Sequence, residues 1–483
     1  MNICNLEPKK VFEFFSAISS IPHGSGNTEK IADYCIDFAS KRGLESYRDD
    51  GGNVMIFSKG TKGYEESEPV ILQGHLDMVC EKDPDCKINM ENESITLCND
   101  EKYIWADKTT LGGDDGIAIA YILAILDSDN IPHPPIEALL TNDEEIGMLG
   151  ARELDASKLK AKRLINIDSE EEGILTVSCA GGVRAYCTLS LDFENTESKN
   201  LVAYDVEISG LTGGHSGIDI NKNRKNAVKI LSRLLEYVSS KCDFSISHLN
   251  GGGKENAIPQ TAKVVLCVSD EQSQTFVKTV SDFYEILKTE LVSTDPNVLI
   301  TVNKTQLPEQ SVTSDSTRKV IFALMQIPDG VQTMSPDIPN MVQTSLNLGT
   351  AVISDNALEM SFLIRSNAAT GKQSVIQTLN SFVEYLDGKV IYKNDYPVWE
   401  YRADSHLRDI MVDVYKEVYA DTPVIKAIHA GLECGILSAK IEDADMVSFG
   451  PNLFNVHTSK EKMDIESVKR CWNYLIKVLE NLK

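Results

Sequence analysis

The sequence lacks the features of membrane and nucleic-acid-binding proteins. No apolar run approaches the roughly 20 residues that a membrane-spanning helix needs, and the first ten residues contain no basic segment followed by an apolar one. Basic residues are scarce, because 47 Lys and Arg stand against 72 Asp and Glu, for a formal net charge of -25. Such a charge repels phosphate backbones and anionic lipid headgroups. We therefore expect neither nucleic acid nor membrane as a partner, and a cytoplasmic location.

The sequence also lacks the patterns of disulfide scaffolds and of nucleophilic enzymes. Its 11 cysteines are an odd number and form no Cys-x-x-Cys pair, which argues against a disulfide framework and a thiolate zinc knuckle. There is no Gly-x-Ser-x-Gly elbow and no phosphate-binding Gly-x-x-x-x-Gly-Lys loop. Cys80 and Cys434 have no obvious base beside them. Any catalytic chemistry must come from other residues.

The patterns that are present predict an α/β fold. Apolar positions between residues 8 and 41 recur at helical spacing, so two amphipathic helices open the chain. Strands and helices then alternate in the rhythm of a mostly parallel sheet with flanking helices. The expected strands are 53–57, 70–73, 136–141 and 164–167, with a helix at 117–126 and a hairpin at 94–98 and 102–106.

The pattern changes after Gly181-Gly182 to alternating strands separated by acidic loops. We expect a second, α+β domain there, inserted into the first. The predicted boundaries are 1–185 and 396–483 for the first domain and 186–395 for the insertion. At 483 residues the chain is long enough for two domains.

Five side chains of types that bind metal ions stand behind apolar runs. They are His75, Asp114, Glu145, Asp168 and His457. In open parallel α/β sheets, ligands bind outside the carboxyl ends of the strands, so these side chains are expected to converge there. Two imidazoles, two terminal carboxylates and one carboxylate able to bridge suit zinc, cobalt or manganese and are poor for calcium. The set therefore predicts a site for two divalent metal ions.

Each of these residues also has an ordinary explanation when it is taken alone. His75 and Asp77 fit a solvated turn after a strand, and Asp114 fits an N-cap of the following helix equally well. Adjacent carboxylates such as Glu144-Glu145 are common on surface turns. Here they lie between a buried-looking strand and Ile146-Gly147-Met148, a setting unsuited to solvated charge. The metal-site hypothesis assigns Asp77 to orient His75, and Glu144 to act as general base.

Several longer segments resemble a known family. They are GHLDMV at 74–79, TLGGDDGIA at 110–118, TNDEEIGMLGA at 141–151, NIDSEEEG at 166–173, GLTGGHSG at 210–217, GGGKENAIP at 251–259, HAGLECG at 429–435 and GPNLFNVHTSKE at 450–461. In these segments the chain resembles the co-catalytic dinuclear zinc metallopeptidases, which include dipeptidases, aminoacylases and carboxypeptidases. Within that family it is most similar to the aminoacylhistidine (Xaa-His) dipeptidases.

The resemblance implies a role for each residue. His75 and Asp168 would hold one metal, Glu145 and His457 the other, with Asp114 bridging, Asp77 supporting His75 and Glu144 as base. In the inserted lid domain, His215 would stabilise the oxyanion, and Asn256 and Arg365 would hold the substrate's C-terminal carboxylate. Without the resemblance, a glycine-rich hairpin explains His215 and a surface strand explains Arg365.

The implied activity is metal-dependent hydrolysis of dipeptides, either Xaa-His or of broad specificity, with two ions per chain, zinc first and cobalt or manganese as alternatives. An N-acyl amino-acid hydrolase and a non-catalytic metal-binding interaction protein remain open. So does a homodimer, and with it whether His215 acts within its own subunit. One departure is Asp115, where relatives often have Asn, which adds charge beside the metals.

Overall fold

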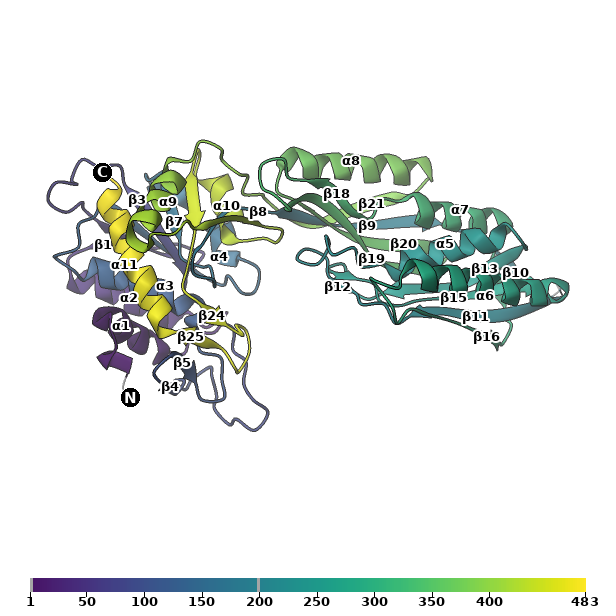
Figure 1. Ribbon diagram of the computed structural model, residues 1–483, viewed down its shortest axis with the longest axis horizontal. Helices are drawn as coiled ribbons and strands as arrows, with labels where there is room; N and C mark the ends of the chain where they lie inside the picture. Colours follow the sequence, from purple (N-terminus) through teal and green to yellow (C-terminus); the bar gives the residue numbers. More distant parts are fainter. Residues whose placement is uncertain (1–2, 198–199) are drawn as a thin grey trace. The chain divides into compact units, whose positions relative to one another are not determined.

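The computed structural model describes residues 3–197 and 200–483, which divide into two units (Figure 1). The first unit runs up to Cys179 and also contains Trp399–Ala427 and Leu432–Lys483. The second unit consists of Ala180–Val398 and the short excursion Ile428–Gly431. The expected boundaries at 185 and 395 fall inside strands β9 (Gly181–Ser190) and β21 (Lys389–Tyr396), which pair in the second unit's sheet. No pattern in the sequence indicates that residues 428–431 belong to the second unit.

The first unit is built on a sheet with a parallel centre. Its strand order is β1-β2-β6-β3-β7-β23-β8-β22. Strand β3 pairs in parallel with β6 and β7, and β7 pairs in parallel with β23, whereas β1, β2 and β8 join antiparallel. The strands are β1 (Glu45–Arg48), β2 (Val54–Ser58), β3 (Val70–His75), β6 (Ile136–Thr141), β7 (Arg163–Asn166), β8 (Ile174–Cys179), β22 (Val424–Ile428) and β23 (Asp445–Ser448). The expected α/β fold is confirmed.

Helix α3 (Gly113–Leu126) is the central helix of this unit. Every residue from Gly116 to Leu126 is buried, as is typical of a helix that is apolar all round. The Tyr121 hydroxyl donates to the Val468 carbonyl of α11 at 2.7 Å, and its ring stacks on Trp472. The other helices are α1 (Lys9–Ser19), α2 (Glu29–Lys41), α4 (Leu149–Glu153), α9 (His406–Tyr419), α10 (Glu433–Lys440) and α11 (Ile465–Asn481).

A small antiparallel sheet joins the predicted hairpin to the C-terminal part of the chain. Its order is β24-β25-β5-β4, with β4 (Leu97–Asn99), β5 (Tyr103–Ala106), β24 (Leu453–Phe454) and β25 (Lys462–Asp464). Residues 455–461 therefore form the connection between β24 and β25. This pairing anchors the loop that carries His457.

The second unit has an antiparallel sheet covered by helices, the α+β insertion that was expected. The strand order is β16-β11-β15-β13-β19-β20-β9-β21, with β18 paired to β19. Helices α5 (Ala227–Ser239), α6 (Ser273–Glu290), α7 (Ser314–Gln326) and α8 (Ala369–Tyr385) share one apolar core with it (Figure 1). The remaining strands are β10 (Phe193–Asn195), β11 (Leu201–Ser209), β12 (Gly214–His215), β13 (Phe244–Gly252), β14 (Ala257–Ile258), β15 (Ala262–Ser269), β16 (Leu299–Thr305), β17 (Gln310–Val312), β18 (Gly330–Met334), β19 (Val342–Ser354) and β20 (Ala357–Ser366).

Among the residues described, no helix combines the length and the apolar character that crossing a membrane requires.

Candidate active site

Three neighbouring parallel strands deliver candidate ligands to one edge of the first unit's sheet. His75 is the last residue of β3, Glu145 follows the end of β6 at Thr141, and Asp168 follows the end of β7 at Asn166. Because β3 pairs with both β6 and β7, these carboxyl ends are adjacent. The edge is the one where ligands are expected in such sheets.

Asp114 lies between the two imidazoles. His75 Nε2 is 3.0 Å from Asp114 Oδ1, and His457 Nε2 is 3.1 Å from Asp114 Oδ2. Asp168 Oδ1 lies 3.9 Å from His75 Nε2, and Glu145 Oε1 lies 2.9 Å from His457 Nε2. The structure thus brings all five predicted ligands together, with each imidazole beside its own terminal carboxylate and Asp114 between them.

The charge distribution of this cluster fits divalent cations. Burial lowers the pKa of His75, but contacts with Asp114 and Asp77 outweigh burial and raise it well above its ordinary value. Asp114 and Glu145 raise the pKa of His457 to about 10. Both shifts show that the surrounding carboxylates favour positive charge at the imidazoles. Metal ions supply that charge while the imidazoles bind as neutral ligands, so the donor set fits two such ions.

Asp77 connects the histidine to the glutamate pair. Its carboxylate accepts hydrogen bonds from the Ser25 hydroxyl at 2.7 Å and from the amides of Glu144 and Glu145 at 2.9 and 3.2 Å. His75 Nδ1 lies 2.9 Å from the Asp77 carbonyl oxygen and 3.4 Å from Asp77 Oδ1. The main-chain carbonyl is therefore the nearer acceptor for Nδ1–H. This leaves Nε2 as the nitrogen that faces Asp114.

A hydrogen bond fixes the backbone of Glu144, whereas its side chain is not engaged in the same way. Its amide donates to Asp77, and its carboxylate has no hydrogen-bond or ion-pair partner in the part of the chain that the structure describes. Burial, together with nearby carboxylates of Glu433, Glu145 and Asp114, raises the pKa of Glu144 to about 8. A buried carboxylate with a raised pKa has the properties of a general base.

Asp115 is fully part of this cluster. The side chain is 1% exposed, and Oδ2 accepts a hydrogen bond from the His75 amide at 3.1 Å. Ligand atoms of His75, Asp115 and Asp168 lie within 4.8 Å of one another, as do those of His75, Asp114 and Glu145. Burial raises the pKa of Asp115 well above its ordinary value. The expected extra acid therefore lies beside the candidate ligands.

The second unit gathers the other predicted residues around one loop. His215 in β12 pairs with Ala257 in β14, and the Ser216 amide donates to the Asn256 carbonyl at 2.9 Å. The amides of Gly217 and Ile218 both donate to His215 Nδ1 at 3.2 Å. Nδ1 is thus an acceptor, so a neutral His215 carries its proton on Nε2. Burial, and then Arg365, lowers the pKa of His215, which favours this neutral form.

Arg365 lies against the same loop. It is 7% exposed, and a Cβ on Gly217 would lie 2.3 Å from its Nη1, so the glycine permits this approach. Nη1 reaches the His429 carbonyl at 3.5 Å, while Nε is buried without a hydrogen-bond partner in the described residues. Buried polar groups are normally satisfied, so an unpaired guanidinium nitrogen indicates a missing acceptor. Asn256 itself is exposed, and no contact of its side chain is described.

Sequence reasoning missed four residues that complete these sites. Glu433 is fully buried and accepts hydrogen bonds from Gln73 at 2.7 Å and Thr141 at 2.6 Å, beneath the ends of β3 and β6. Ser25 fixes Asp77, and His429 reaches Arg365 through its carbonyl. Glu461 binds the loop before α3. Two quoted segments, HAGLECG and GPNLFNVHTSKE, contain three of them, but no local pattern shows what they contact.

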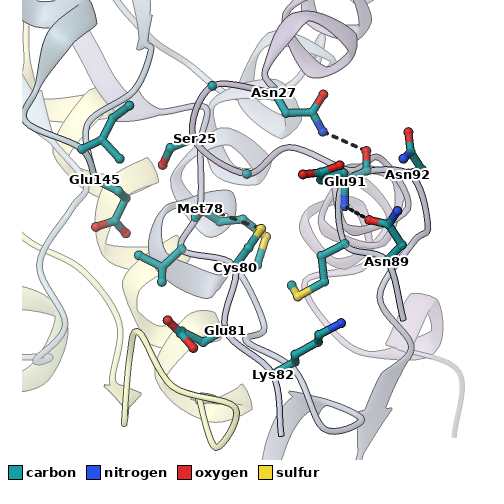
Figure 2. Close-up of a pocket in the computed structure, with 15 residues that line it drawn as sticks. Ser25, Asn27, Met78, Cys80, Glu81, Lys82, Asn89, Glu91, Asn92 and Glu145 are labelled. Atoms are coloured by element: carbon teal, nitrogen blue, oxygen red, sulfur yellow. Dashed lines mark hydrogen bonds between the residues drawn. The ribbon is translucent and has the colours of Figure 1, made fainter. Parts of the chain in front are cut away.

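A cavity of about 830 Å³ opens beside Glu145 within the first unit (Figure 2). Its lining includes the apolar side chains of Met78, Met90 and Ile146, and the acids Glu81 and Glu91. In the described part of the chain, neither acid's carboxylate has a hydrogen-bond or ion-pair partner. The lining therefore combines apolar side chains with the three acids Glu81, Glu91 and Glu145 and one cation, Lys82.

Comparisons with known proteins agree with this geometry. The cytosol non-specific dipeptidase of Escherichia coli (strain K12) is 36% identical over 480 residues, 99% of each chain. The crystal structure of aminoacylhistidine dipeptidase from Vibrio alginolyticus matches with a TM-score of 0.96 and 36% identity, covering 100% of this chain and 98% of that one. Aminopeptidase PepT from Bacillus cereus shares the fold, with a TM-score of 0.57 and 14% identity over 99% of both chains. A model of the peptidase family M20/M25/M40 matches residues 71–481, and the chain therefore belongs to this family.

Proposed function

We propose that this protein is a metal-dependent dipeptidase that hydrolyses the peptide bond of dipeptides, either Xaa-His or of broad specificity. One observation carries the proposal: the Asp114 carboxylate presents one oxygen to His75 and the other to His457. A carboxylate placed in this way can bridge two ions. The names of the two relatives at 36% identity support the choice of dipeptides as substrates.

The proposed centre takes two divalent ions, with zinc the first choice and cobalt or manganese as alternatives. His75 and Asp168 would hold one ion, His457 and Glu145 the other, and Asp114 both. Ions bound there would polarise the scissile carbonyl and acidify a water molecule. The imidazole and carboxylate donors of this chain fit that role because their ligand atoms already face one another.

The side chains of this chain perform the remaining steps. Glu144, unpaired and with a raised pKa, takes a proton from the attacking water and passes it to the leaving amine. His215 donates its Nε2–H to the carbonyl oxygen as negative charge develops there. Arg365, supported by Asn256, pairs with the C-terminal carboxylate of the dipeptide. The unpaired Nε of Arg365 supports this role, because guanidinium binds carboxylate through two parallel hydrogen bonds.

We further propose that the side chain of the dipeptide's first residue enters the cavity beside Glu145. The scissile carbonyl belongs to that residue, and Figure 2 shows Glu81 and Glu91 around the same space as Glu145. Apolar or cationic first residues should then be preferred to acidic ones. Glu81→Gln should narrow the preference for Lys over norleucine at the first position, measured as the ratio of kcat/KM values. An unchanged ratio would exclude Glu81 from substrate recognition.

A substrate profile tests the activity. Protein stripped of metal and reloaded with zinc, cobalt or manganese is assayed against dipeptides, tripeptides and N-acetyl amino acids. Hydrolysis of dipeptides with a free α-amine supports the proposal, whereas preferred turnover of N-acetyl amino acids would favour an aminoacylase. Two bound ions without any turnover would indicate a non-catalytic metal-binding protein.

Two further expectations remain proposals. The name of the Escherichia coli relative supports a cytoplasmic location. Homodimer formation stays a prediction, and light scattering of the purified protein tests it. Only in a dimer could His215 act in the other subunit.

A further inference from the structure

The start of α3 lacks the cap that other helices of this chain supply from their own sequence. Helices α5, α7, α9 and α11 begin after Asn226, Thr313, Ser405 and Asp464, whose side chains accept from amides of the first turn. Residue Gly112 precedes α3 and offers no side chain. Asp114 and Asp115 have non-helical backbone angles, so the regular part of the helix begins after them, and the amides of residues 111–114 lie before it and need acceptors from elsewhere.

Glu461 provides these acceptors from the C-terminal part of the chain. Its Oε2 accepts from the amides of Leu111 and Gly112 at 2.8 and 3.2 Å. Its Oε1 accepts from those of Gly113 and Asp114 at 2.8 and 3.4 Å. The side chain is 2% exposed. A Cβ on Gly113 would lie 3.2 Å from Oε1, so this glycine leaves room for the carboxylate.

The side chain of Asp114 faces the two histidines and does not cap the helix. By sequence, Asp114 was as good a candidate for the N-cap as for a metal ligand, yet the structure shows no side-chain cap at this helix start. Glu461 holds the backbone of Asp114 through its amide, while both side-chain oxygens of Asp114 face His75 and His457.

Glu461 also links the two loops that form this part of the site. It lies four residues after His457, and its own amide donates to the Thr458 carbonyl at 3.1 Å, closing a tight turn. The turn therefore contacts the start of α3 twice, through the His457 imidazole and through the Glu461 carboxylate. The carboxylate contact holds the loop of His457 against the loop that carries Asp114.

We infer that Glu461 is a positioning residue of the metal centre, which holds Asp114 and His457 in ligating geometry by binding the amides of residues 111–114. The inference rests on the proposed metal centre. Outer-shell groups of this kind typically contribute about 10- to 100-fold to metal affinity.

The test is Glu461→Gln, with Glu137→Gln as matched control. Glutamine keeps one acceptor oxygen and turns an NH₂ group toward amides that also donate. Glu137 is likewise a buried glutamate, 5% exposed, that accepts from the backbone amides of Lys160 and Ala161 at 3.0 and 3.1 Å. Both variants lose hydrogen bonds from a buried carboxylate, but Glu137 contacts no candidate ligand.

Metal affinity is measured by calorimetric titration of the stripped full-length protein with Co²⁺ or Zn²⁺, without peptide. We expect Glu461→Gln to weaken at least one binding step about 10- to 100-fold relative to Glu137→Gln, and excess metal to restore turnover. If Glu461→Gln loses thermal stability like the control yet binds both ions as the parent does, Glu461 only stabilises the fold and the inference is wrong. A parent protein that binds no divalent ion would instead overturn the metal centre itself.

Discussion

Replacing Asp77 with Asn should weaken both the fold around the site and its metal affinity. The Asp77 carboxylate is 1% exposed and serves three donors, namely Ser25 and the amides of Glu144 and Glu145. Asparagine keeps one acceptor oxygen, so at least one donor faces an NH₂ group. Each hydrogen bond lost from a charged group costs about 1.5–3 kcal/mol. Metal affinity should fall about 10- to 100-fold, because the loop that carries Glu145 is no longer fixed against His75.

The assay pairs Asp77→Asn with Asp445→Asn. Asp445 is 8% exposed and accepts from the Ser405 hydroxyl and from the Leu407 amide at 2.8 Å, but it contacts no candidate ligand. Urea unfolding of the metal-free proteins should show comparable losses in the free energy of unfolding. Metal titration should distinguish the two variants, because only Asp77→Asn should bind metal more weakly than the parent protein. Equal metal affinity in the two variants would refute the reasoning.

Three further predictions concern catalysis. Arg365→Lys should lower kcat/KM strongly for dipeptides but much less for dipeptides amidated at the C-terminus. Equal losses of kcat/KM on the two kinds of substrate would show that Arg365 supports the fold and does not bind the carboxylate. His215→Ala should lower the chemical step about 10²- to 10³-fold with metal content unchanged, and the parent rate at saturating substrate would contradict its role. The pKa of Glu144 is about 8 without metal against an ordinary 4.5. Bound cations lower it, so kcat/KM should fall on acidification with a midpoint below about 8, and a midpoint above that value would contradict Glu144 as the base.

The positions in the fold of the candidate ligands His75 and Asp168 could be predicted because each follows a local pattern. His75 and Asp168 stand at or just after apolar runs, and runs that alternate with helices form parallel strands whose ends meet. The helix expected at 117–126 lies within α3, because the apolar run that predicts it is local. The expected boundaries at 185 and 395 fall within β9 and β21, since alternation does not show where a paired strand begins or ends.

The role of Asp114 could not be decided from sequence, because a cap and a ligand look alike next to a helix start. The loop that carries Asp114 is held by Glu461, whose hydrogen-bond partners at 111–114 lie 347 to 350 residues away. Glu433 was missed for the same reason, because Gln73 and Thr141 come from distant strands. Contacts between distant segments therefore limited the prediction of how the site is supported, rather than of what it contains.

The central claim is that five side chains hold two ions while Glu144 moves the proton. It is tested most directly by measuring metal content and dipeptide turnover together in Glu144→Gln. We expect two ions per chain, as in the parent, and turnover lower by about 10²- to 10⁴-fold. An ion lost along with the activity would place Glu144 among the ligands, and parental turnover with both ions bound would contradict its role as the base.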